Sequence, residues 1–99
     1  MGMMISVLTP DRELFHGEIV SVKVPGADGQ FQVLNNHAPI VSALTEGTVS
    51  MVTDVGDYRY YEDTEGKVVT KDVPGQTISF TINGGFIEVL NNNISILVQ

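Results

Sequence analysis

Hydrophobic and polar residues alternate with a period of two along much of the chain. Val20, Val22 and Val24 occupy every second position, and the same spacing recurs in segments 78–82 and 94–98. Successive side chains of a β-strand point to opposite faces, so this spacing predicts strands. The spacing of three to four residues that is typical of amphipathic helices is almost absent.

Short clusters of turn-forming residues separate these apolar segments. They are Pro25-Gly26, Asp28-Gly29, Asn35-Asn36, Glu46-Gly47, Glu65-Gly66, Pro74-Gly75, Asn83-Gly84-Gly85 and Asn91-Asn92. Turn signals at such short intervals are typical of β-sandwiches and barrels. A single sheet would leave one apolar face in water, so the pattern predicts an all-β fold, a two-sheet antiparallel β-sandwich.

The inward positions of the predicted strands define the expected core. Its members include Phe31, Val33, Val49, Met51, Ile82 and Val89. Phe80 is also placed on the inward face, and its truncation to alanine is expected to cost about 3–5 kcal/mol if the ring is buried.

The segment 54–75 predicts an additional β-hairpin within a single domain that spans residues 1–99. Its tyrosines, Tyr58, Tyr60 and Tyr61, favour cross-strand aromatic packing over an exposed platform for a ligand. The segment also carries the acidic residues Asp54, Asp57, Glu62, Asp63 and Glu65. They lack the spacing of a calcium-binding loop, so we interpret them as a solvated turn.

Length and composition limit the possible functions. A chain of 99 residues without cysteine forms one small core and has no disulfides, which fits a cytoplasmic setting. The formal net charge of −7, with only 5 scattered basic residues, argues against binding nucleic acid. No apolar run reaches the roughly 20 residues of a membrane-spanning helix, so direct membrane insertion is not expected.

The residues that could support catalysis are few. His16 lies beside Phe15 and is interpreted as a partly exposed strand residue. His37 precedes Ala38 and Pro39, which fix the course of its loop, so it either stabilises the turn or forms part of an interface. The sequence therefore predicts no catalytic residues, no metal site and no cofactor, and no enzyme activity.

Three segments in a fixed order resemble one known family. They are residues 7–12 with 15–17, residues 24–47 with the turn 26–29 and the His-Ala-Pro loop, and the Gly-Gly-aromatic segment 84–89. In this order they resemble the epsilon subunit of F-type ATP synthases, specifically its N-terminal β-sandwich domain. Many epsilon subunits continue into a two-helix C-terminal domain, which the sequence ending at Gln99 does not include, so a naturally short form or an isolated sandwich is expected.

The resemblance implies a function and partners. It implies a rotor subunit of the central stalk that couples the proteolipid c ring to the gamma subunit during ion-driven ATP synthesis. One copy per complex is implied, held peripherally at the cytoplasmic face of a bacterial cell membrane. The resemblance places Asp28, Gly29 and Gln30 toward the ring, and His37, Ala38 and Pro39 toward gamma.

Two rival functions remain open from the residues alone. The first is a β-sandwich that binds protein or sugar, is unrelated to ATP synthase and uses the tyrosines as a platform. The second is a small hydrolase that uses His37 with a nearby serine or aspartate.

Overall fold

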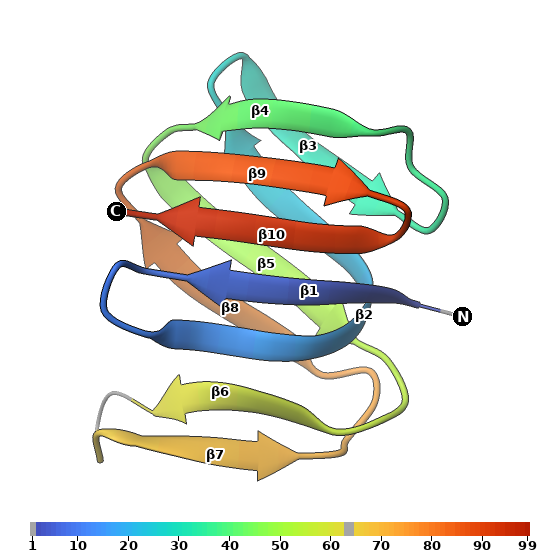
Figure 1. Cartoon of the computed structure of the whole chain (residues 1–99), viewed down its shortest axis with the longest axis vertical. Coiled ribbons are helices and arrows are strands. Elements are labelled where there is room, and N and C mark those ends of the chain that lie inside the picture. The colour runs from blue at the N-terminus through green and yellow to red at the C-terminus, as the bar shows by residue number, and fades with distance from the viewer. Residues whose placement is uncertain (1, 63–64) are drawn as a thin grey trace.

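The computed structural model describes residues 2–62 and 65–99, which form ten β-strands in two layers (Figure 1). The strands are β1 (Met3–Leu8), β2 (Glu13–Gly26), β3 (Gly29–Leu34), β4 (Ile40–Leu44), β5 (Gly47–Thr53), β6 (Tyr58–Glu62), β7 (Lys67–Lys71), β8 (Thr77–Ile82), β9 (Gly85–Leu90) and β10 (Asn93–Val98). Within the described ranges, no helix is long and apolar enough to cross a membrane.

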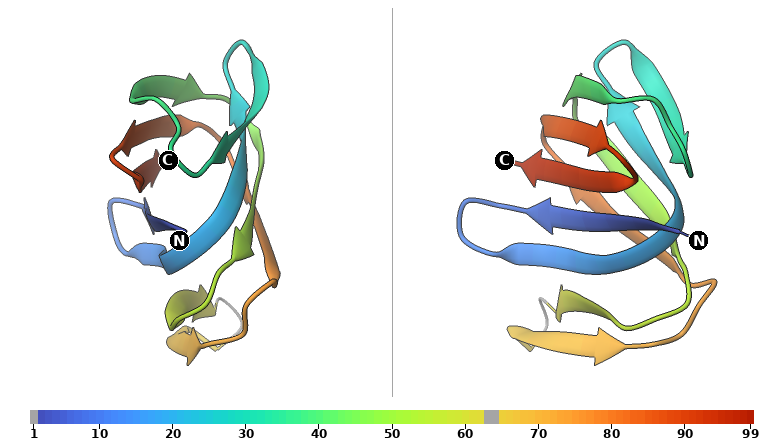
Figure 2. Two further views of the ribbon diagram at one scale, coloured as in Figure 1. Left: turned by 90° about the vertical axis from the view of Figure 1, so that its right-hand side faces the viewer. Right: turned by 45° about the vertical axis from the view of Figure 1, so that its right-hand side comes forward.

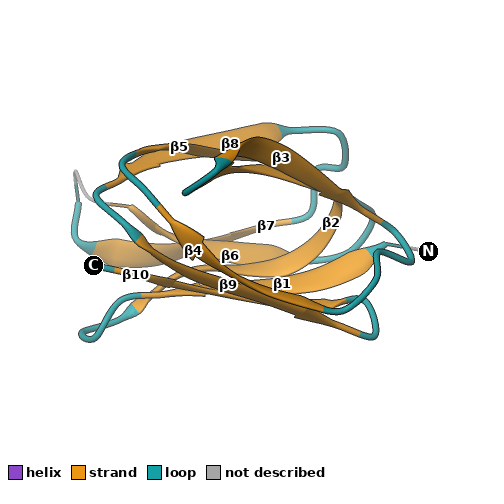
Figure 3. Ribbon diagram, turned by 90° about the horizontal axis from the view of Figure 1, so that it is seen from above, coloured by secondary structure: helices purple, strands orange, loops and turns teal. Residues whose placement is uncertain are grey.

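The long strand β2 connects the two layers. Its first part pairs with β1 and β6, and these strands continue the first layer, which also contains β10, β9, β4 and β7. Its second part pairs with β3 and β5, and β8 completes the second layer. Figures 2 and 3 show the two layers facing each other. The predicted all-β sandwich is thus confirmed.

One strand pair departs from the antiparallel arrangement. β1 and β10 run parallel, with Ile5 opposite Ile94 and Val7 opposite Ile96. Parallel neighbours require a long connection, and here almost the whole chain lies between the two strands. The first layer therefore contains one parallel pair, and the other strand pairs among the described residues are antiparallel.

A β-bulge in β2 alters the predicted alternation. Val20 was expected to share a face with Val22 and Val24, but its side chain is 48% exposed. The register between β2 and β5 shifts between Ile19 and Ser21, so Ile19 takes the core position that the strict alternation assigns to Val20. A bulge inserts one extra residue into a strand and reverses the faces beyond it.

The predicted core is largely confirmed. Five of its expected members are buried, namely Val33, Val49, Met51, Ile82 and Val89. Phe31 and Phe80 pack against this core but stay partly exposed. They lie on β3 and β8, the two edge strands of the second layer, where no further strand covers their outer side.

The hairpin of β6 and β7 extends the first layer. Its strands pair with each other, and β6 also pairs with β2 through Phe15 and Tyr60. Tyr58 is 2% exposed, and its ring stacks on Phe15 with 5.6 Å between the ring centroids. The aromatic packing predicted for this segment is confirmed at Tyr58. Asp63, which the sequence grouped with the acidic turn, lies outside the described residues.

Candidate docking surfaces

The predicted ring-facing residues form a tight turn between β2 and β3. Gly26 pairs with Gly29, which leaves Ala27 and Asp28 as a two-residue connection. Gly29 has a φ of 126°, which side chains other than glycine rarely adopt. The Asp28 and Gln30 side chains are both exposed. The turn therefore presents a carboxylate and an amide to solvent at one end of the sandwich.

A second turn lies directly beside the first. The Thr45 backbone N–H donates to the Pro25 carbonyl at 2.8 Å, and the Ala27 N–H donates to the Ala43 carbonyl at 3.1 Å. Glu46, in this second turn, is exposed like Asp28. The end of the sandwich around Asp28 thus carries two exposed carboxylates on turns that are joined by backbone hydrogen bonds.

The His37 loop lies at the opposite end of β3. His37 is half-buried, and its Nδ1 lies 2.7 Å from the carbonyl oxygen of Ala38. A carbonyl oxygen only accepts, so Nδ1 carries the hydrogen in this contact. The imidazole therefore stabilises its own turn, while Ala38 and Pro39 are exposed.

Two asparagines join the His37 loop to the turn between β9 and β10. The Asn36 backbone N–H donates to the Asn92 side-chain oxygen at 2.8 Å, and the Asn92 amide donates back to the Asn36 side chain at 3.3 Å. Asn36, His37, Pro39, Asn91 and Asn92 line a hollow of about 340 Å³. The predicted site residues thus form two separate groups, at the two ends of β3.

An apolar row crosses the outer face of the first layer. Register places Ala43 of β4 opposite Phe86 of β9, Phe86 opposite Leu97 of β10, and Leu97 opposite Leu8 of β1. Phe86 and Leu97 are 54% and 53% exposed, and as direct neighbours on β9 and β10 they form a contiguous apolar patch. We call Leu8, Ala43, Phe86 and Leu97 the outer apolar row.

Sequence reasoning missed the outer apolar row, although a signal was present. The segments 86–90 and 94–98 carry apolar residues on both faces of their strands rather than on one. Val41 on β4 and Leu90 on β9 add to the exposed apolar surface of the same layer. A sheet with two apolar faces indicates either a buried layer or a contact surface.

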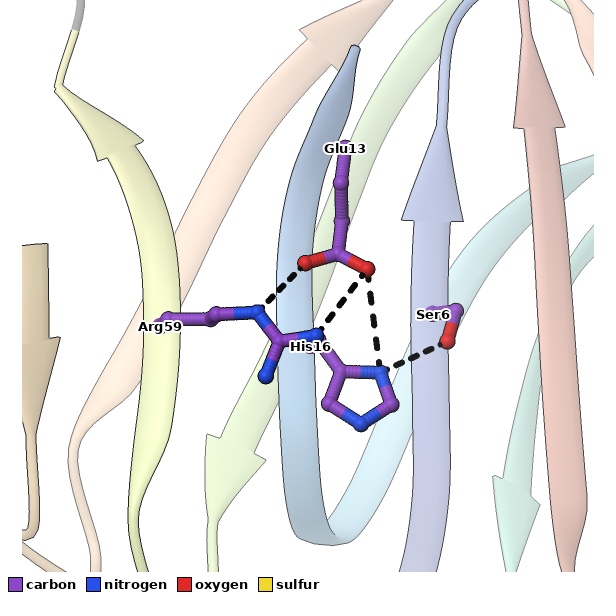
Figure 4. Close-up of polar contacts among 4 residues, drawn as sticks. All are labelled: Ser6, Glu13, His16 and Arg59. Carbon is purple, nitrogen blue, oxygen red and sulfur yellow. Dashed lines mark hydrogen bonds and ion pairs between the residues drawn. The ribbon is translucent and has the colours of Figure 1, made fainter. Parts of the chain in front are cut away.

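A polar cluster lies on the first layer at the strands β1, β2 and β6 (Figure 4). The Arg59 Nε donates to the Glu13 carboxylate at 2.7 Å. Ser6 Oγ lies 2.8 Å from His16 Nδ1, and the Glu13 carboxylate lies 3.9 Å from the same nitrogen. A serine relay needs the acid and the serine on opposite ring nitrogens, so this arrangement does not form a catalytic triad.

Neither rival function gains support from the site geometry. His37 Nδ1 is engaged by a backbone carbonyl, and no described serine or aspartate hydrogen-bonds to its ring. Tyr58 is buried, and Arg12 lies over the Tyr61 ring with its guanidinium carbon 4.2 Å from the centroid. In the described part of the chain, no three acidic or histidine side chains are placed to hold a metal ion.

These features define a small β-sandwich domain that presents an apolar sheet face and exposed end turns. A family profile described as "ATP synthase, Delta/Epsilon chain, beta-sandwich domain" matches residues 2–66. The chain belongs to this family. Relatives include the ATP synthase epsilon chains of Caulobacter vibrioides, 38% identical over 95% of this chain and 86% of the relative, and of Chlorobium limicola, 35% identical over 96% and 86%.

Other relatives are longer than the region they share with this chain. The epsilon chain of Salinibacter ruber is 30% identical over 96% of this chain but only 56% of its own length. Among solved structures, the fold resembles one chain in a structure of the Tetrahymena thermophila mitochondrial ATP synthase central stalk and c ring. The TM-score is 0.65 and the identity 20%, and the match covers 100% of this chain and 64% of that chain. It also resembles a chain of the Euglena gracilis mitochondrial ATP synthase, with a TM-score of 0.71 and 18% identity, covering 98% and 50%. The relatives do not favour a binding module unrelated to ATP synthase.

Proposed function

We propose that this chain is a central-stalk subunit of an F-type ATP synthase that couples the proteolipid c ring to the gamma subunit. The observation that carries the proposal is the exposed outer apolar row on a sandwich whose relatives are named epsilon chains. The chain would transmit torque without catalysing a reaction, and ATP chemistry would occur on other subunits. A close-packed sandwich with short turns suits this mechanical role.

The outer apolar row is the proposed contact with gamma. Phe86 and Leu97 lie side by side near its centre, and Leu8 and Ala43 continue it across the neighbouring strands. Aromatic and aliphatic side chains at the centre of an interface contribute most of the binding energy. A similar fold occurs in a solved structure of an ATP synthase central stalk and c ring, which supports a partner within the stalk. We assign gamma to this face.

The turn around Asp28 is the proposed contact with the c ring. Its exposed carboxylate would meet a basic side chain on a polar loop of the ring, and Gly29 and Gln30 would lie against the same loop. A solvent-exposed ion pair contributes about 0–1 kcal/mol, so this contact would orient the sandwich more than hold it. The chain would thereby lie peripherally at the cytoplasmic face of the membrane.

The His37 loop is the proposed boundary of the gamma contact. Pro39 leads directly into β4, whose outer face carries Val41, 74% exposed, and Ala43. The exposed Ala38 and Pro39 would extend the contact from the sheet face onto its end. One copy of the chain would be present in each complex.

Substitutions on the sheet face test the gamma contact. We expect Phe86→Ser and Leu97→Ser each to weaken binding to purified gamma from the same source by about tenfold, because each removes exposed apolar area from the centre of the interface. Val55→Ser is the matched control, since Val55 is 67% exposed but lies in a loop away from this face. Affinity is measured by surface plasmon resonance, with thermal unfolding as a check on folding.

Two results would contradict the proposal. One is unchanged gamma binding by both face variants. The other is an equal loss of binding by the loop control, which would indicate nonspecific hydrophobic adhesion rather than docking on the outer apolar row.

A further inference from the structure

A groove separates β8 from the hairpin of β6 and β7. The groove measures about 490 Å³, and β8 pairs with neither β6 nor β7. Its lining residues are Leu14, Phe15, Tyr60, Tyr61, Glu62 and the segment 77–81. Figure 2 shows the hairpin at one end of the sandwich, beside the start of β8. The groove therefore opens along the free edge of the second layer.

The free edge of β8 lacks the charged residues and proline that usually protect an edge strand against pairing. In the described part of the chain β8 pairs only with β5, and this register is regular from Thr77 to Ile82. Proteins usually protect such edges with charged side chains, proline or bulges. The strand TISFTI contains no charged residue and no proline. Its unpaired backbone groups are thus available to an added strand.

The side chains along the groove are incompletely buried. Leu14 and Tyr60 from the first layer and Ile78 and Phe80 from β8 all pack against the core but remain partly exposed. The hairpin extends the first layer beyond β8, so no strand of the second layer faces it. An extended segment added to β8 would cover these four side chains and bury their exposed apolar area.

The structure assigns to this groove one extended segment of a partner polypeptide, added as a strand to the free edge of β8. Its alternate side chains would be apolar and enter the groove, and a carboxylate would lie beside Lys71. Lys71 pairs with Tyr58 in the hairpin, and its Nζ lies 5.9 Å from the ring centroid of Tyr60, which lines the groove. Among the described residues no carboxylate forms an ion pair with it.

A second copy of this chain fits the groove poorly. Each copy carries a net charge of −7, which opposes close association. The segment TISFTI of another copy would also offer no carboxylate to Lys71. Residues 60–62 of β6 line the groove opposite β8, so the space suits a single extended segment better than a second sheet.

This inference goes beyond the proposed stalk function, because it uses elements separate from the outer apolar row and the Asp28 turn. A synthetic seven-residue peptide of alternating valine and threonine with glutamate at one end is the probe. The matched peptide carries lysine at that end. Each is added to the full ¹⁵N-labelled chain, and amide signals and amide hydrogen exchange are followed.

We expect the glutamate peptide to shift the amide signals of β8 and to slow the hydrogen exchange of these amides. It should bind two- to fivefold more tightly than the lysine peptide, because one exposed ion pair contributes up to about 1 kcal/mol. Lys71→Glu should reverse this preference. Lys23→Glu makes the same charge change at an exposed site on β2, away from the groove, and should leave the preference intact.

Three outcomes would overturn the inference. The first is the absence of β8 shifts with either peptide at millimolar concentration. The second is a peptide preference that Lys71→Glu does not alter. The third is a set of β8 shifts that depend on protein concentration without peptide, which would make a second copy the occupant. None of these outcomes bears on gamma binding, so the stalk proposal is tested separately.

Discussion

Three phenylalanines on predicted strands have three different environments. Phe15 is 1% exposed and stacks on Tyr58, Phe80 packs against the core from an edge strand, and Phe86 is 54% exposed. All three occur in alternating or apolar segments, so their sequence context is similar. The difference arises from which layer and which edge each strand occupies.

Truncation of these rings should separate the three environments. Phe15→Ala is expected to lower the free energy of unfolding by about 3–5 kcal/mol, because it leaves a cavity at the stacked pair. Phe86→Ala should change it by no more than about 0.5 kcal/mol, as for most surface substitutions. Phe80→Ala should fall between them. Urea unfolding measures all three, and equal losses for Phe15 and Phe80 would mean that the edge of β8 is covered in solution.

The hairpin of β6 and β7 is attached to the sandwich by a few specific contacts. Tyr58 inserts into the core beside Phe15, and Arg59 on the opposite face of β6 pairs with Glu13 of β2. Gly17 permits the close approach of the strands, because a Cβ there would overlap the Tyr58 side chain. The hairpin is thus anchored through β6, while β7 forms the outer edge.

A double-mutant cycle measures how much the ion pair contributes to this attachment. Glu13→Gln, Arg59→Gln and the double variant should give a coupling energy of about 0.2–1 kcal/mol, because both side chains are partly exposed, at 32% and 48%. The readout is chemical unfolding at low salt. A coupling near zero would mean that the attachment depends on the Phe15–Tyr58 stack and the pairing of β6 with β2 rather than on the ion pair.

On the scale of the whole molecule, the charged and apolar contact surfaces are distinct but adjacent. The outer apolar row follows one end of the strands of the first layer, and its member Ala43 accepts a backbone hydrogen bond from Ala27, next to Asp28. Asp28 and Glu46 occupy the exposed turns beyond it. The net charge of −7 favours a basic partner at the acidic end. The two proposed contacts therefore depend on different forces.

Salt should affect these two contacts differently. Raising the ionic strength from 0.1 M toward 1 M shortens the Debye length from about 10 Å to about 3 Å. We expect binding to purified c ring in nanodiscs to weaken severalfold, and binding to gamma to change by less than about twofold. Surface plasmon resonance with each partner measures this. Equal salt dependence of both contacts would contradict the claim that they depend on different forces. Asp28→Asn should reduce the salt dependence for the ring only.

The candidate site could be predicted only in part from the sequence. The turn at Asp28 and the loop at His37 could be identified from the sequence, because the geometry of a turn depends on a few neighbouring residues, here Gly29 and Pro39. The outer apolar row and the groove beside β8 could not be identified in this way. Both depend on the order of strands in space, since residues such as Leu8, Phe86 and Leu97 are distant in the chain.

The sequence by itself determined the strands, the turns and the need for two apolar layers. These follow from local spacing and turn chemistry, which require no knowledge of distant contacts. Only the tertiary structure decided that β1 runs parallel to β10, that a bulge turns Val20 outward and that Phe80 lies at an open edge. The physical reason is that pairing and burial are set by contacts between segments far apart in the chain, so identical local patterns can end in a core, an edge or an exposed face.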